Sequence, residues 1–120
     1  MEGLDSQKLF DKWKGCEAAI WHFEISHGRL IIGLYQESVK GCLEISCLDA
    51  EFICGFTRWS DCNLKIEKAD YHTNYNIPIC FVISDEKAKF EVHCGAIKAI
   101  ELEDIYGLSG NASDSRFARE

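Results

Sequence analysis

Proline, long apolar runs and linker segments are scarce in this sequence of 120 residues, and each scarcity excludes a class of protein. Proline occurs once, at Pro78, and no stretch rich in proline, glycine or serine divides residues 1–106. We therefore expect a single domain over residues 1–106 and a flexible tail over residues 107–120. No apolar run is long enough to cross a bilayer, and the first residues lack the basic start and apolar stretch of a secretory signal. These absences predict a cytoplasmic protein without membrane contacts.

The cysteines lack the spacing that zinc and redox sites require. The sequence has seven cysteines, an odd number, and none belongs to a C-x-x-C pair. Structural zinc sites usually take two ligands from such a pair, and disulfide scaffolds belong to secreted proteins. We therefore expect reduced thiols and no cofactor. Four of the cysteines fall on the apolar side of an expected strand and should lie in the core: Cys47, Cys54, Cys62 and Cys94.

Motifs of common enzyme families are also missing. The sequence contains no G-x-G-x-x-G and no G-x-S-x-G. Gly28 and Gly33 have the spacing of a phosphate-binding loop, but Leu34 and Tyr35 follow where lysine and a hydroxyl residue must contact phosphate and magnesium. Nucleotide binding through such a loop is therefore excluded, and we expect binding to another molecule more than catalysis.

Alternating apolar and polar residues dominate the chain from residue 18 to residue 103. Before them, residues 5–15 have the cap and the apolar face of a short helix, with Leu9, Phe10 and Trp13 on one side. The alternation of period two then predicts seven or eight short strands joined by tight turns. The fold class is therefore mainly β, at the margin of α+β. We expect an antiparallel meander that closes as a small barrel or folds as a sandwich.

Three segments carry specific expectations within this pattern. Trp21, Phe23 and Ile25 should share the buried face of the first strand, and Phe52, Cys54 and Phe56 that of the fourth. The continuously apolar segment 79–83 should be a central strand. Residues 69–77 form the longest expected loop, which ends at Pro78 and contains Tyr71, His72 and Tyr75.

Two pairs of histidine and glutamate have the spacing that brings both side chains to one face of a strand. The pairs are His22 with Glu24 and Glu91 with His93. If their strands were neighbours, the four side chains could bind a divalent metal or perform acid–base chemistry. The competing interpretation is that they are solvated residues on the polar side of amphipathic strands.

The charge of the chain indicates the chemistry of a partner. The formal net charge is −7, from 13 basic and 20 acidic residues. Residues 107–120 hold two of each sign, so the excess belongs to the expected domain. Nucleic acid and anionic membranes are poor partners for such a surface, whereas a protein with a basic surface is a good one. Glu101, Glu103 and Asp104 form the densest acidic cluster, which either attracts such a partner or keeps a sheet edge solvated.

The favoured function is a small protein-interaction module, for which an inhibitor or immunity-type protein that binds a basic partner is one example. Aromatic residues outside the alternation are its candidate anchors, because tyrosine and tryptophan dominate interface hot spots. The alternative is that they pack against the end of the core, which is favoured for Trp59 and is as well supported as binding for Tyr71 and Tyr75. Two alternatives remain open: a small-ligand-binding β-barrel, and a metal-dependent enzyme that uses the His/Glu pairs. The oligomeric state is left open. The expected partner-binding residues are Trp59, Tyr71, His72, Tyr75, Glu101, Glu103 and Asp104.

Overall fold

The computed structural model describes residues 2–103, which contain one helix and nine strands. The predicted tail over residues 107–120 lies outside the described residues. No helix within residues 2–103 combines the length and the apolar character that crossing a membrane requires. The elements are α1 (Glu2–Lys12), β1 (Glu17–Glu24), β2 (Arg29–Tyr35), β3 (Cys42–Leu48), β4 (Phe52–Cys54), β5 (Arg58–Trp59), β6 (Lys65–His72), β7 (Pro78–Asp85), β8 (Phe90–Cys94) and β9 (Ala96–Leu102).

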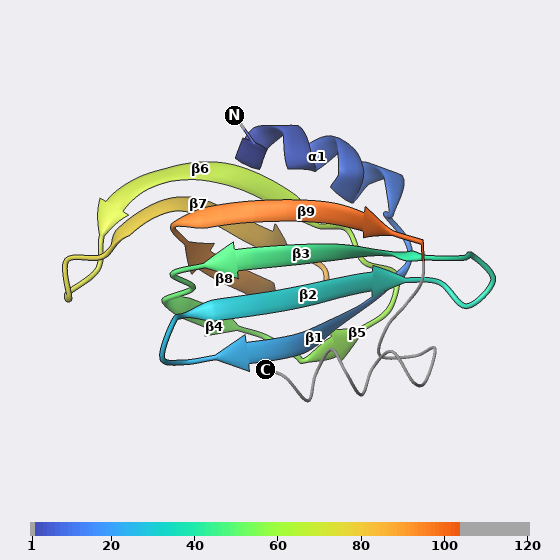
Figure 1. Cartoon of the computed structure of the whole chain (residues 1–120), viewed down its shortest axis with the longest axis horizontal. Coiled ribbons are helices and arrows are strands. Elements are labelled where there is room, and N and C mark those ends of the chain that lie inside the picture. The colour runs from blue at the N-terminus through green and yellow to red at the C-terminus, as the bar shows by residue number, and fades with distance from the viewer. Residues whose placement is uncertain (1, 104–120) are drawn as a thin grey trace.

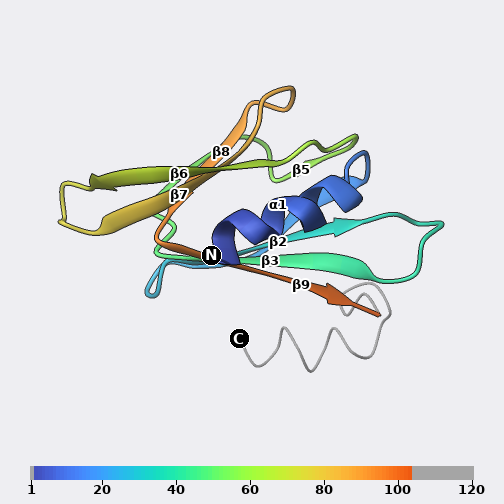
Figure 2. The ribbon, with the colours of Figure 1, turned by 90° about the horizontal axis from the view of Figure 1, so that it is seen from above.

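The strands form two sheets that lie one above the other (Figure 1, Figure 2). Sheet A has five strands in the order β5-β1-β2-β3-β9, and sheet B has four in the order β4-β8-β7-β6. All paired neighbours run antiparallel. The prediction of a mainly β, antiparallel fold is confirmed, and the two layers form a sandwich that does not close into a barrel. The segment 79–83 belongs to β7, which lies between β8 and β6 as predicted for a central strand.

Helix α1 occupies the side of the sandwich where closure would be needed. Strand β6 ends sheet B and β9 ends sheet A, and α1 packs against both of these edges (Figure 2). Phe10 and Trp13 are buried, as the predicted apolar face requires. The helix begins and ends about three residues earlier than the predicted range 5–15. Its end is followed by Gly15, whose φ of 90° suits glycine and turns the chain toward β1.

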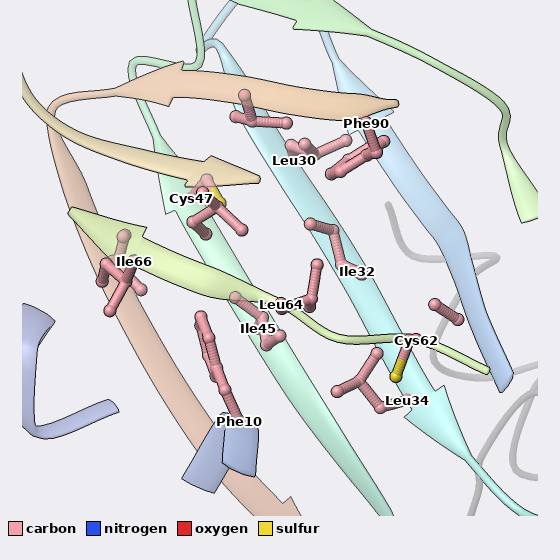
Figure 3. Packing of buried hydrophobic residues seen from close by; sticks show 14 of the residues in the cluster. Phe10, Leu30, Ile32, Leu34, Ile45, Cys47, Cys62, Leu64, Ile66 and Phe90 are labelled. Atoms are coloured by element: carbon pink, nitrogen blue, oxygen red, sulfur yellow. The ribbon is translucent and has the colours of Figure 1, made fainter. Parts of the chain in front are cut away.

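The core fills the space between the two sheets (Figure 3). Leu30, Ile32 and Leu34 point inward from alternate positions of β2, and Ile66 and Phe90 meet them from the side of sheet B. Each of these side chains is buried. Large apolar residues that meet in this way contribute most of the stability of a domain of this size, roughly 1.5–3 kcal/mol for each fully buried side chain.

A bulge in β1 overturns the predicted buried face of the first strand. Ile20 pairs with Ile32, but His22 already pairs with Ile31, so Trp21 is an extra residue between them. An extra residue reverses which side the following residues face. As a result Phe23 is 43% exposed, and Ile25 lies in the turn with 84% of its surface exposed.

Trp21 itself lies over the neighbouring strand. A Cβ atom on Gly33 would come within 2.2 Å of the Trp21 ring, so only glycine leaves room for the indole at this place. The ring also stacks on Tyr35 with 6.2 Å between the centroids. The large residue that the alternation assigns to the core therefore covers the backbone of β2.

The predicted loop over residues 69–77 is mostly a hairpin. Strand β6 continues through His72 and β7 begins at Pro78, so residues 73–77 alone connect them. A register shift between Lys68 and Tyr71 allows this long pairing. At the tip, the hydroxyl oxygen of Thr73 accepts hydrogen bonds from the amides of Tyr75 and Ile77. The hairpin projects beyond the other strands (Figure 1), and most of its residues 69–77 are exposed.

Candidate interaction surface

The outer face of sheet B can be derived from its register. His93 of β8 pairs with Phe52 of β4 on one side and with Val82 of β7 on the other, and residues paired in this way share a face. Their neighbours Ile53 and Val92 pack against the core. Phe52, His93 and Val82 therefore point away from the core. Glu91, two residues from His93, lies on the same outer face.

A hydrogen-bonded chain of three side chains crosses this face. The Tyr71 hydroxyl is hydrogen bonded to Nδ1 of His93, and Nε2 of His93 lies 2.5 Å from Oε2 of Glu91. A neutral imidazole with its proton on Nε2 satisfies both bonds, because Nε2–H donates to the carboxylate while Nδ1 accepts from the phenol. These bonds join strands β6 and β8, which are separated by β7.

Phe52 completes the arrangement, and we call Phe52, Tyr71, Glu91 and His93 the outer-face cluster. The ring of Phe52 packs on the imidazole of His93 with 4.9 Å between the centroids, and the Tyr71 ring meets the imidazole edge-on at 5.8 Å. Phe52 is 47% exposed and Tyr71 is 41% exposed. The cluster therefore presents two aromatic rings to solvent while contacts among its own side chains hold them in place.

A shallow cavity of about 510 Å³ adjoins the cluster. Phe52 and Glu91 belong to its lining, together with Lys65, Glu67 and Lys89. Charges of both signs around an exposed ring are typical of the border between the apolar centre and the polar rim of a protein interface. The cavity lies on the surface of sheet B, whereas the space between the sheets is filled by the core.

The predicted residues of the hairpin lie beside this cluster or beyond it. Tyr71 belongs to the cluster, His72 is exposed at the end of β6, and Tyr75 is 84% exposed at the hairpin tip. The sequence pattern missed Phe52, which it placed on a buried face together with Cys54 and Phe56. That prediction is wrong: Cys54 is exposed, and Phe56 is 70% exposed.

The misplacement of Phe52 has a physical cause. Strand β4 has three residues and ends at Cys54, so its own alternation is too short to show which side faces the core. The polar residues Glu91 and His93 did indicate the outer face of β8. Assigning Phe52 to that face requires knowing that β4 pairs with β8. The local sequence pattern does not show which strands pair.

Trp59 belongs to the core and is not a surface anchor. It is 8% exposed, and its ring lies 4.4 Å from that of Phe90. Its Nε1–H donates to Oδ2 of Asp85 over 2.8 Å. Asp85 is 1% exposed and accepts a second hydrogen bond from the amide of Asn63. Of the two interpretations that the sequence allows for Trp59, the structure therefore supports packing.

The acidic cluster is divided by the structure. Glu101 of β9 accepts hydrogen bonds from Nε1 of Trp13 at 2.8 Å and from Nζ of Lys12 at 2.7 Å, so it attaches α1 to sheet A. The pKa of this carboxyl is below its usual value, mainly because of the hydrogen bond from Lys12 and to a smaller extent because of the one from Trp13. Glu103 is exposed at the end of the described chain, and Asp104 lies outside the described residues.

The two His/Glu pairs do not come together. His22 and Glu24 belong to β1 in sheet A, whereas Glu91 and His93 belong to β8 in sheet B. Glu24 instead contacts His27, with 3.1 Å between Oε2 and Nδ1, and this hydrogen bond lowers the pKa of Glu24. Residues 2–103 contain no group of three or more His, Cys, Asp or Glu side chains arranged to hold a metal ion.

In comparison with known proteins, no family model, no curated protein and no solved structure matches the chain.

Proposed function

We propose that the protein is an interaction module that binds another protein through the outer-face cluster and the tip of the β6–β7 hairpin. The observation that carries the proposal is the ordered exposure of Phe52 and Tyr71 around His93. An aromatic ring that is already held in one position loses little entropy when a partner covers it. Tyr75 extends the surface along the hairpin.

A basic partner surface fits the charge of the chain. The net charge of −7 attracts such a partner over long range, and Glu67 and Glu91 lie beside the exposed Phe52 ring. Steering of this kind increases the association rate more than the affinity, so the association rate should fall as salt is added. We also propose that the module works in the cytoplasm, which its seven free cysteines support.

The test has two stages. The immobilised protein first captures partners from a lysate of its source cells, and quantitative mass spectrometry compares the wild type with the Phe52→Ala and Tyr75→Ala variants. The protein whose recovery depends on both residues is then purified, and its Kd is measured by calorimetry. We expect each variant to increase Kd by about tenfold or more, as for hot-spot residues.

Val39→Ala is the matched control, because Val39 is 47% exposed, like Phe52, but lies in the turn between β2 and β3. It should leave Kd within about twofold of the wild-type value. Equal recovery of all partners by the wild type and by both cluster variants, with unchanged melting temperatures, would show that this face is not the binding surface.

A further inference from the structure

Two cysteines from opposite sheets meet in the core. Cys47 belongs to β3 of sheet A, and Cys94 is the last residue of β8 in sheet B. Both are 0% exposed, and Cys94 is the neighbouring side chain that most affects the Cys47 thiol. Both belong to the single cluster of buried residues that fills the sandwich (Figure 3 labels Cys47). Two buried thiols from opposite sheets are therefore neighbours in the core, which the alternation alone did not reveal.

The backbone holds the two thiols at this place. Gly95 is the one residue between β8 and β9, so the chain passes from sheet B to sheet A directly after Cys94. The Gly95 amide donates to the carbonyl of Leu48, the residue after Cys47, over 2.9 Å. A Cβ on Gly95 would lie only 3.2 Å from the carbonyl oxygen of Pro78, so the crossing is tightly packed. Cys94 is thereby fixed against β3.

We propose that Cys47 and Cys94 form an inter-sheet disulfide when the protein meets a small-molecule disulfide as oxidant. The thiolate of one cysteine attacks the reagent, forms a mixed disulfide and releases one molecule of thiol. The second cysteine then attacks the mixed disulfide and releases the other thiol molecule. Two cysteine thiols are oxidised, one reagent disulfide is reduced to two thiols, and the two cysteine protons pass to the released thiolates.

The environment of the pair determines how fast the reaction proceeds. The contact with Cys94 and the burial of the thiol raise the pKa of Cys47 well above its ordinary value. Since the thiolate is the attacking species, oxidation should be slow at neutral pH and faster in alkaline solution. The reagent also needs a local opening of the crossing between β8 and β9. The two cysteines therefore stay reduced during brief exposure to oxidant. They form the disulfide during sustained exposure or during folding in an oxidising medium.

The experiment uses the full chain with Cys54→Ala and Cys80→Ala, because these two exposed thiols would otherwise join separate molecules. The protein is treated with hydroxyethyl disulfide at pH 7 and pH 9, in the folded state and during refolding. Peptides are then mapped by mass spectrometry without reduction. We expect a cross-linked peptide that contains Cys47 and Cys94, formed faster at pH 9. Closing this long loop should raise Tm by about 5–15 °C, and dithiothreitol should reverse the increase.

Controls separate this pair from the other buried thiols. Cys42→Ala changes a fully buried cysteine of the same strand and should leave the cross-link intact, whereas Cys47→Ala and Cys94→Ala should each abolish it. Cys16 and Cys62 are the competing pair, since the Cys62 amide donates to the Cys16 carbonyl over 3.0 Å. A cross-link between Cys16 and Cys62 alone, or none between Cys47 and Cys94 even after oxidative refolding, would overturn the proposal.

Discussion

Asp85 shows how one buried carboxylate can organise a whole end of the sandwich. Its Oδ2 accepts hydrogen bonds from the indole of Trp59 and from the amide of Asn63, and its Oδ1 lies 3.4 Å from the amide of Ala88. Strand β5, the connection to β6 and the turn after β7 therefore share one acceptor. A buried charge is tolerated in a core when donors surround it in this way.

We predict that Asp85→Ala lowers the free energy of unfolding by about 2–4 kcal/mol, measured by urea denaturation. The reason is that the donors of Trp59 and Asn63 remain buried after their common acceptor is removed. Trp59→Phe combined with Asp85→Ala should lose less than the sum of the two single changes, since one of the orphaned donors is then absent.

Asp61→Asn is the control at the same end of the molecule, because asparagine tolerates the φ of 54° that the backbone has at this residue. Asp61 forms an exposed ion pair with Lys87 at 2.7 Å, and exposed pairs of this kind contribute little. Its loss should change the free energy of unfolding by no more than about 0.5 kcal/mol. Equal effects of Asp85→Ala and Asp61→Asn would show that the Asp85 hydrogen bonds do not hold this end together.

At the scale of elements, α1 protects an open sheet edge as well as filling the gap between the sheets. The side chain of Gln7 behaves like a short piece of strand: its Nε2 donates to the Leu64 carbonyl at 3.2 Å, and its Oε1 accepts from the Ile66 amide at 2.8 Å. Unpaired edge groups are otherwise a template for association with another chain. The helix thus satisfies the backbone at the start of β6 without adding a strand.

Gln7→Ala should therefore expose the β6 edge. We expect a loss of about 1–2 kcal/mol in the free energy of unfolding, because the Ile66 amide loses its acceptor. Amide hydrogen exchange followed by NMR should show faster exchange at Ile66. Lys8→Ala changes the adjacent, exposed position of the same helix and should leave the Ile66 exchange rate as it is in the wild type. If both variants exchange alike, the Gln7 side chain does not protect the edge.

Local periodicity accounts for most of the elements, and its failures have identifiable causes. The apolar face of α1 and the inward residues of β8 follow directly from spacing, since burial selects one side of a regular element. The bulge at Trp21 is different, because it depends on the close approach to Gly33 of another strand. The outer-face cluster also could not be derived, since Phe52, Tyr71 and His93 meet only through the order β4-β8-β7-β6. Pairing between distant segments is the information that local patterns lack.

At the scale of the whole molecule, three carboxylates form hydrogen-bonded contacts at separate places on the surface. Their pKa values are lowered mainly by a hydrogen bond from His27 to Glu24, from Lys87 to Asp61 and from Lys12 to Glu101. A carboxyl whose pKa is lower in the folded state binds fewer protons there than in the unfolded chain. Its stabilising effect is complete above the pKa of the unfolded chain and disappears as the pH falls through the lower, folded value.

We therefore predict that the free energy of unfolding decreases as the pH is lowered from about 5 to about 3, within the range where carboxyl groups of unfolded chains titrate. The triple variant Glu24→Gln, Asp61→Asn and Glu101→Gln should show a shallower decrease. High salt should also weaken the dependence, because all three contacts lie at the surface, where charges are screened. Urea denaturation at a series of pH values measures the slope.

A control of equal charge distinguishes these contacts from the general effect of removing negative charge. Glu37→Gln, Glu51→Gln and Glu103→Gln remove three exposed carboxylates elsewhere on the surface. Both triple variants reduce the self-repulsion of a chain with a net charge of −7 at neutral pH, so both share that contribution. The first should flatten the acid limb further, because it removes the three carboxyls whose pKa is lowered in the folded chain. Matching slopes in the two variants would assign the acid sensitivity to net charge alone, and the three surface contacts would then contribute nothing to the pH dependence of stability.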